Sequence, residues 1–449
     1  MPMTRRNPLI LLWQALGSSA YQFVVPAAAL SLFAAMAFFW LGGFHRAYFS
    51  VLHFFASREE EPFATPFLDM DYLLATAQCS RHGFDVYLSN PCDALGRLFD
   101  YSPLWLIVMP RRLGSADTLW LGALVDVAFL SSLLFVMRPR SPAEAAIFGL
   151  AVFSPATLFA LERANSDLLI FLLILYGSAV DNGAPIRRGL SYLFYLTAGL
   201  LKYYPLVLLI LLVRHRRRVA LLYGGAMVSA LLAFAFYYRG QIIASLANVP
   251  ESSCIAERFH PSFVGNAFGA KNLPFGLACR LGAAWLPPGA VAAALFLILS
   301  LMTLFRIRRT MRSFAAAEID WHGSELQTLA LASLLIASCF FAGTSLDYRE
   351  IYFLLAIPGL LELRSAAKTA AQRRLCSLLC AALPLLMWGQ FIRQGFSGAF
   401  ASAAWAVREL LWWWVAAAFA AIALSYLTRQ PFIEEFARSL RSRIEAGKG

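Results

Sequence analysis

Hydrophobic residues occur in long blocks along the chain, and short polar or charged segments separate the blocks. Many blocks are about 16 to 25 residues long, which is the length of a helix that crosses the hydrocarbon core of a bilayer. Because lipid offers no partners to free backbone N–H and C=O groups, each block is expected to be an α-helix. The pattern therefore predicts an all-α polytopic membrane protein with about twelve transmembrane helices.

The predicted helices alternate in direction and leave two large loops, 44–115 and 239–284, which are expected outside the cytoplasm. Both termini are expected inside. The predicted spans cover about 21–43, 117–137, 143–160, 167–181, 219–238, 285–305, 327–344, 351–363, 375–392 and 405–427.

Residues 189–213 are long enough for one span, but arginines flank them on both sides. Two short segments, 189–201 and 204–213, would place both basic flanks in the cytoplasm, with a turn at Lys202 and Pro205. Proline favours a break there. Both segments are too short to cross fully and are expected to be re-entrant, with a single span as the alternative.

The positive charge supports this topology. The chain of 449 residues carries a net charge of +12, although only 14% of its residues are charged and 60% are hydrophobic. Clustering of basic residues beside spans is the positive-inside signal, and we prefer it to nucleic-acid binding. The main runs are Arg5-Arg6, Arg138-Pro139-Arg140, Arg187-Arg188, Arg214–Arg218, Arg306–Arg312 and Arg373-Arg374, followed by Arg438, Arg441 and Arg443.

The chain divides into four predicted parts. Residues 1–20 form a cytoplasmic segment, and residues 21–365 form a membrane module that includes both large loops. Residues 366–429 form C-terminal spans, and 430–449 form a cytoplasmic tail.

Four of the seven cysteines lie in the two predicted outer loops, two in each. Cys79 and Cys92 share the first loop, and Cys254 and Cys279 share the second. This distribution favours two local disulfides in an oxidising compartment over four free thiols. The chain has no pattern typical of a structural zinc site, and no metal or other cofactor is predicted.

Ionisable residues gather at the expected outer ends of the spans and in the outer loops. Buried charges in membranes are costly and usually functional. The candidates in the loops are Asp69 and Asp71 in the first loop and His260 and Lys271 in the second. Those at the ends of spans are Glu162, Arg163, Asn165 and Asp167 after the third span, Lys202 at the turn of the re-entrant segment, and Asp347, Tyr348 and Arg349 before the tenth span.

Carboxylates and cations from separate segments would then share one membrane face. A carboxylate can take a proton from a hydroxyl nucleophile, and Arg or Lys can stabilise a phosphate as negative charge develops. The structural alternative is that Glu162-Arg163 and Asp347-Arg349 are interfacial ion pairs that fix helix ends.

At these residues the chain resembles the polyprenyl-phosphate-dependent C-type membrane glycosyltransferases, and most of all glycosyltransferase family 87, which contains bacterial mannosyltransferases. Ala164 stands where relatives often have Gly. The resemblance spans residues 20–365, in order, through Asp69-Met70-Asp71-Tyr72, Gly83-Phe84-Asp85-Val86-Tyr87, Tyr101-Ser102-Pro103-Leu104, Ser154-Pro155, Glu162–Asp167, Gly199–Pro205 and Asp347-Tyr348-Arg349.

The resemblance implies a helical bundle in the bacterial inner membrane, with an outward-facing cavity roofed by the first loop. It implies inverting sugar transfer from a polyprenyl-phosphate donor to a lipid or glycan acceptor. Asp69 matches the catalytic carboxylate, with Asp71 as runner-up, and Lys202, Arg163 or Arg349 would hold the donor phosphate, with His260 and Lys271 as further candidates.

Two other functions remain open. A transporter or flippase of a polar lipid or glycan would also carry charges near a cavity, although such sites more often lie at the bilayer midplane. A non-catalytic subunit of an envelope polysaccharide system would tolerate substitution of Asp69 and Lys202.

Overall fold

The computed structural model describes residues 8–55, 66–181, 184–249, 267–281, 287–315, 319, 321–343 and 345–446. These residues are mostly helical, and their two short strands form one antiparallel pair. Within this part of the chain, seven helices are long and apolar enough to cross a membrane, or eight if one bent pair counts as a span. The prediction of an all-α protein with several membrane-spanning helices is thus confirmed. The number of about twelve spans stays a prediction.

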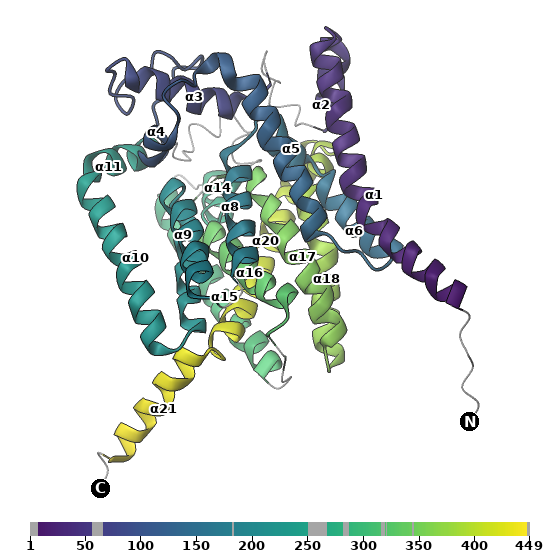
Figure 1. The fold of residues 1–449 in the computed structure, drawn as a ribbon, viewed down its shortest axis with the longest axis vertical. Helices are drawn as coiled ribbons and strands as arrows, with labels where there is room; N and C mark the ends of the chain where they lie inside the picture. Colours follow the sequence, from purple (N-terminus) through teal and green to yellow (C-terminus); the bar gives the residue numbers. More distant parts are fainter. Residues whose placement is uncertain are drawn as a thin grey trace.

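The long apolar helices are α1 (Pro8–Leu41), α5 (Thr118–Val136, preceded by the short 3-10 helix η1, Ser115–Asp117), α10 (Arg217–Tyr237), α15 (Pro288–Ala315), α16 (Ser324–Ala342), α18 (Ala370–Met387) and α20 (Gly398–Leu427). Of these seven helices, α16 and α20 lie in the middle of the bundle and are the most buried, whereas α1 and α10 lie at its periphery (Figure 1).

The remaining elements are shorter and include the helices that carry most of the candidate residues. They are α2 (His45–Phe55), α3 (Leu68–Arg81), α4 (Leu104–Val108), α6 (Pro142–Val152), α7 (Pro155–Glu162), α8 (Ser166–Val180), α9 (Pro185–Leu201), η2 (Tyr204–Arg214), α11 (Arg239–Ala247), β1 (Ala267–Phe268), α14 (Asn272–Leu281), β2 (Ser345–Leu346), η3 (Asp347–Tyr352), α17 (Phe353–Ala366), α19 (Gly389–Gln394) and α21 (Pro431–Ala446).

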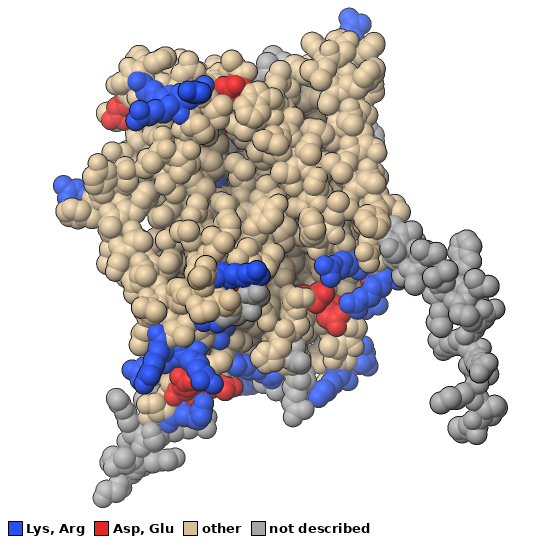
Figure 2. Space-filling model, viewed as in Figure 1, with Lys and Arg blue, Asp and Glu red and all other residues tan. Residues whose placement is uncertain are grey.

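Charged side chains lie mainly at two ends of the molecule (Figure 2). Lys and Arg gather at the lower end, where α10 and α21 begin, and a smaller group lies at the upper end over α3. The surface between them is largely uncharged on this face, as expected of a band that contacts lipid. The long axis of the bundle therefore runs from one charged end, through the uncharged band, to the other charged end.

The predicted third span is a bent pair rather than one helix. Helices α6 and α7 meet at an angle of 47°. Pro155 has no N–H to donate to the carbonyl of Ala151, so the helix breaks there. The hydroxyls of Ser154 and Thr157 donate to that carbonyl instead, at 2.8 and 2.9 Å. The freed backbone oxygen is thus satisfied within the protein, as the membrane interior requires.

Helix α9 and the 3-10 helix η2 form an antiparallel hairpin. The turn lies at Lys202 and Tyr203, between the end of α9 and the start of η2. At the other end, the Tyr192 hydroxyl of α9 lies 3.0 Å from Nε2 of His215, just after η2. The hairpin places Arg187 and Arg188, in the first turn of α9, at the same end as the arginine run that starts at the last residue of η2, which is the arrangement that the two-segment prediction requires.

The two predicted large loops contact each other beside the end of α9. The Asn248 side chain, after α11, donates to the carbonyls of Tyr87 and Phe99 at 2.9 and 3.1 Å. Trp105 of α4 donates to the carbonyl of Leu201 at 3.1 Å. Loop residues therefore lie directly over the turn that carries Lys202.

Strand pairing places η3 against the second loop. Ala267 pairs with Leu346, and Phe268 pairs with Ser345. The Ala270 amide also donates to the carbonyl of Phe340 at the end of α16, at 2.7 Å. Because η3 follows β2 directly, this pairing fixes the start of η3 and with it the positions of Asp347, Tyr348 and Arg349.

The hairpin gives His215 an unusual environment that pH can test. Burial, together with the charges of Arg214 and Arg188, lowers the pKa of His215 from 6.5 to about 4. The unfolded chain therefore binds the proton first, so stability falls as pH decreases from 6.5 towards 4 and levels off below. We expect His215→Gln to lose less thermal stability than wild type between about pH 7 and pH 5.

The measurement is the melting temperature of purified protein in detergent at both pH values. Since every other titrating group is shared by the two proteins, their difference isolates His215. Equal losses in the two proteins would show that this imidazole is not held neutral in the hairpin.

Candidate active site

The N-terminus of α3 docks on the turn between α7 and α8. The amide of Phe67 donates to the carbonyl of Glu162 at 2.8 Å, and the amides of Asp69 and Met70 donate to the carbonyl of Arg163 at 3.1 and 3.3 Å. The first N–H groups of a helix have no partners within the helix. Here the last carbonyls of α7 supply them, so the first loop is joined to the membrane helices at Asp69.

Two strained residues mark this junction. Phe67 and Ala164 have positive φ angles of 67° and 41°, and they are the only non-glycine residues with positive φ in the described part of the chain. This left-handed region costs a residue with a Cβ atom about 1–2 kcal/mol. The Gly expected at position 164 by the family resemblance is therefore the residue that this turn favours.

Asp69 is almost fully buried, with 5% of its surface exposed. Its Oδ2 accepts a hydrogen bond from Nδ2 of Asn165 at 2.5 Å. Its Oδ1 lies 3.6 Å from Arg163 and 3.8 Å from Arg97, beyond the distance of a direct hydrogen bond. One carboxylate oxygen is thus held firmly, and the other faces two guanidinium groups without a close donor from them.

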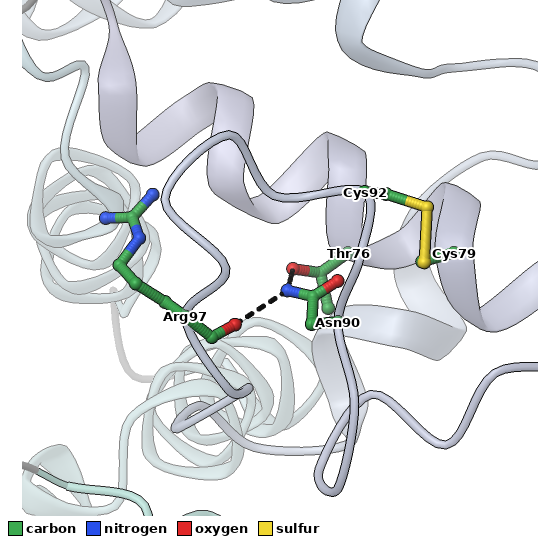
Figure 3. The surroundings of a disulfide bond; sticks show 5 residues. All are labelled: Thr76, Cys79, Asn90, Cys92 and Arg97. Carbon is green, nitrogen blue, oxygen red and sulfur yellow. Dashed lines mark hydrogen bonds between the residues drawn. A yellow bond between two sulfur atoms is a disulfide. The ribbon is translucent and has the colours of Figure 1, made fainter.

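A disulfide and a buried amide hold the segment that delivers Arg97 (Figure 3). Cys79 of α3 is bonded to Cys92, with their Cα atoms 5.6 Å apart. The Asn90 side chain donates to the Thr76 hydroxyl and to the carbonyl of Arg97, both at 2.9 Å. The guanidinium of Arg97 extends away from the disulfide and also pairs with Asp93.

The second predicted disulfide lies partly outside the described residues. Cys279 of α14 is disulfide-bonded, whereas Cys254 is outside the described range. The cysteines of the predicted spans, Cys339, Cys376 and Cys380, are free and buried.

Asp167 organises a second group at the start of α8. Its Oδ2 lies 3.1 Å from Nζ of Lys202 and 3.9 Å from Nε of Arg349. Its Oδ1 accepts hydrogen bonds from the hydroxyls of Tyr204 and Tyr352 at 2.5 and 3.2 Å. A fully buried carboxylate thus collects two cations from segments that are far apart in sequence.

Aromatic rings enclose the ammonium group of Lys202. The Nζ atom lies 5.0 Å from the ring centre of Tyr101 and 5.5 Å from that of Tyr348. Such ring faces attract cations. Lys202 is therefore placed between the first loop and η3, beside Asp167.

Asn165 connects the two groups. Its Nδ2 donates to Asp69, while its Oδ1 accepts the amide of Asp167 at 2.8 Å and caps α8. The structure thus brings together Asp69, Arg163, Asn165, Asp167, Lys202, Tyr348 and Arg349 from the set of predicted candidates.

The other candidates lie elsewhere. Asp71 accepts a hydrogen bond from Thr118 of α5 at 3.0 Å, so it ties α3 to α5 rather than facing the cations. Lys271 is exposed beside α14, and His260 lies outside the described residues. The Glu162 carboxylate lies 3.9 Å from Arg163, at the edge of an apolar cavity.

Asp347 belongs to a buried charge cluster that the sequence motifs did not include. Arg408 of α20 lies 2.8 Å from carboxylate oxygens of both Asp347 and Glu350 and 3.3 Å from Glu409. Trp412 also donates to Glu350, at 3.2 Å. This cluster holds the two residues that flank Tyr348 and Arg349 in η3, so their position depends on α20, a helix in which the sequence showed no candidate residue.

A further carboxyl group, Asp100, was also missed. It accepts a hydrogen bond from the Tyr72 hydroxyl at 3.0 Å, and it lies directly before Tyr101. Burial raises the pKa of Asp100 above its ordinary value, although the Tyr72 hydroxyl and the charge of Lys202 oppose this. A perturbed carboxyl beside a cation group is typical of functional sites, but no motif marked it.

Within the described ranges, no group of three or more His, Cys, Asp and Glu side chains is arranged to hold a metal ion. No family model, curated protein or solved structure matches the chain.

The backbone around Asp69 depends on a glycine in α5. A Cβ atom at Gly122 would lie 2.5 Å from the ring of Phe67, whereas one at Gly149 would lie 3.9 Å from its nearest neighbour, Val25. We expect Gly122→Ala to destabilise the protein by about 1–3 kcal/mol, because Phe67 must move and carries Asp69 with it. Gly149→Ala is the matched control and should leave stability unchanged or slightly raised.

Both variants are compared with wild type by denaturant unfolding in mixed micelles. A Gly122→Ala protein as stable as the Gly149→Ala control would show that the ring of Phe67 does not set this junction.

The cluster around Arg408 gives a second prediction. Arg408→Leu removes the cation from among three buried carboxylates, Asp347, Glu350 and Glu409, and should cost about 3–5 kcal/mol of unfolding free energy. Arg364→Leu, at an exposed arginine of α17, should change little. Unfolding of the two variants in parallel measures this, and similar losses would contradict the role assigned to Arg408.

Proposed function

We propose that this protein transfers a sugar, with inversion, from a polyprenyl-phosphate donor to a hydroxyl of a lipid or glycan acceptor. The reaction would take place at the outer face of a bacterial inner membrane. The bundle would then have about twelve spans, two large extracytoplasmic loops and cytoplasmic basic runs. The support is one arrangement: a buried carboxylate, Asp69, next to cations from separate segments, Arg163 and Arg97.

In the proposed reaction, Oδ1 of Asp69 takes the proton of the acceptor hydroxyl. The acceptor oxygen attacks the anomeric carbon as the bond from that carbon to the phosphate oxygen breaks. The bonding electron pair leaves with the lipid phosphate. Attack opposite the leaving group inverts the anomeric centre. Asp69 then releases its proton to solvent.

Lys202, Arg349 and Arg163 would stabilise the departing phosphate. The ammonium group of Lys202 has three N–H donors and the guanidinium of Arg349 has five. Asp167 approaches both through a single oxygen, Oδ2. Donors therefore remain for phosphate oxygens, and the developing negative charge would be met by cations already in place.

The same arrangement favours a transferase over a transporter. Asp69 and Asp167 lie in the first turns of α3 and α8, Lys202 follows α9, and Arg349 precedes α17. Transporter sites are usually built at the bilayer midplane from interrupted helices. Here the polar residues lie at helix ends beneath the first loop.

Asp69→Asn tests the assigned base. The amide keeps an oxygen that can accept from Asn165 but cannot take the proton, so transfer should fall by about 10²–10⁴-fold. Asp71→Asn is the matched control, because it can still accept the Thr118 hydroxyl and should retain most activity. The assay is transfer from labelled polyprenyl-phosphate sugars by purified protein in lipid, with thermal unfolding to check folding.

Full transfer by both variants would show that neither aspartate is the base. Wild type that is inactive across the panel of donors and acceptors would contradict the transferase hypothesis itself.

A further inference from the structure

A cavity of about 150 Å³ lies between α1, α2, α5 and the bent pair α6–α7. Its wall is overwhelmingly apolar and includes Phe33, Trp40, Leu52, Ala123 and Leu130. Two of the helices that form it, α1 and α5, are long enough to cross the membrane. An apolar cavity between membrane helices is a suitable place for hydrocarbon.

Two carboxyl groups interrupt the apolar wall. Asp126 of α5 and Glu162 at the end of α7 both line the cavity. Asp126 is 1% exposed, and its Oδ1 has no hydrogen-bond partner among the described residues. A buried polar atom without a partner costs free energy, and in a membrane span such a carboxyl is usually functional. A ligand in the cavity can therefore supply the hydrogen-bond donor that Asp126 lacks.

The cavity extends from the candidate active site into the depth of the membrane. Along α5, its wall runs from Leu119 to Leu130, which corresponds to roughly 16 Å of helix. Phe67 also lines it, two residues before Asp69. A chain lying in this cavity would therefore end close to the catalytic carboxylate of the proposed reaction.

The charges on the two sides of Asp69 differ. Arg163 and Arg97 approach its Oδ1, and Lys202 and Arg349 lie with Asp167 nearby. The cavity, in contrast, presents the carboxyls of Asp126 and Glu162. A phosphate would be attracted to the cations, whereas no Lys or Arg stands among the described residues that line the cavity.

We propose that this cavity binds the hydrocarbon chain of the acceptor, and that the acceptor is a lipid that carries an uncharged hydroxyl at the buried end of this chain, apart from the hydroxyl that receives the sugar at Asp69. The buried hydroxyl donates to Asp126. This inference rests on the proposed function, and it assigns the cavity to the acceptor because the anionic donor is suited to the cationic side.

Photolabelling tests the site without any need for transfer. The probe is a long-chain fatty alcohol with an internal diazirine, and the comparison probe is the fatty acid of the same chain, ionised at alkaline pH. Labelled peptides are mapped by mass spectrometry in protein reconstituted in nanodiscs. We expect the alcohol to label α1 and α5, and the anionic probe to label them much less.

Two alanines of α1 provide a matched pair of variants. Ala37 lines the cavity, whereas Ala35 is exposed on α1 and does not line it. Ala37→Phe should lower labelling by the alcohol about tenfold because it fills the cavity, and Ala35→Phe should not. Asp126→Leu should abolish the preference for the alcohol over the ionised acid.

The acceptor role has its own measurement. In the transfer assay, Ala37→Phe should raise the KM for a lipid acceptor about tenfold and leave the KM for the donor unchanged. Labelling that ignores both Ala37→Phe and Asp126→Leu would overturn the inference even in an active enzyme. A raised KM for the donor in Ala37→Phe would also overturn the inference, because it would assign the cavity to the donor. Inactive wild type would instead count against the proposed function, while labelling would still report on the site.

Discussion

The hydrogen bond from the Asn165 amide to Asp69 is the contact on which the candidate site depends. Asn165 is fully buried, and its two polar atoms serve different elements: Nδ2 holds Asp69 of the first loop, and Oδ1 caps α8 at Asp167. A buried amide must satisfy both atoms, because an unpaired one is costly away from water. The two carboxylates therefore cannot move independently, and the cations gathered around Asp167 keep a constant relation to Asp69.

This constraint is held against backbone strain. Phe67 and Ala164, on the two sides of the junction, both adopt the left-handed conformation that residues with a Cβ atom avoid. Strain of this kind persists only where surrounding contacts determine the conformation, and it is concentrated at functional sites. Here the contacts are the amides of Phe67, Asp69 and Met70 on the carbonyls of Glu162 and Arg163. A loop end without these contacts would relax to an unstrained conformation. The strain therefore indicates that the contacts fix the position of Asp69.

Much of this arrangement follows from local sequence, and the rest depends on tertiary packing. Hydrophobic blocks predict membrane helices because lipid forces the backbone to satisfy itself, and the break at Lys202 follows from proline and from basic flanks. The pairing of Arg408 with Asp347 could not be predicted, because it depends on how α20 is rotated against η3. Tyr204 and Tyr352 resemble ordinary interfacial aromatics in sequence, yet their hydroxyls bind buried Asp167. The bend at Ser154-Pro155 was likewise hidden within one continuous apolar block.

The segregation of charge around Asp69 gives the proposed chemistry a direction. A base that accepts a proton from one substrate while a phosphate leaves from another must keep the two substrates apart until they react. The cations on one side would hold the phosphate, and the apolar cavity on the other, with no Lys or Arg among its described lining residues, would accept an uncharged chain instead. Asp69 lies between the cavity and the cations. Phe67, just before α3, lines the cavity, and Asn165, which binds Asp69, precedes Asp167 and its cations. The helix junction that holds the carboxylate is thus also the boundary between the two proposed substrate sites.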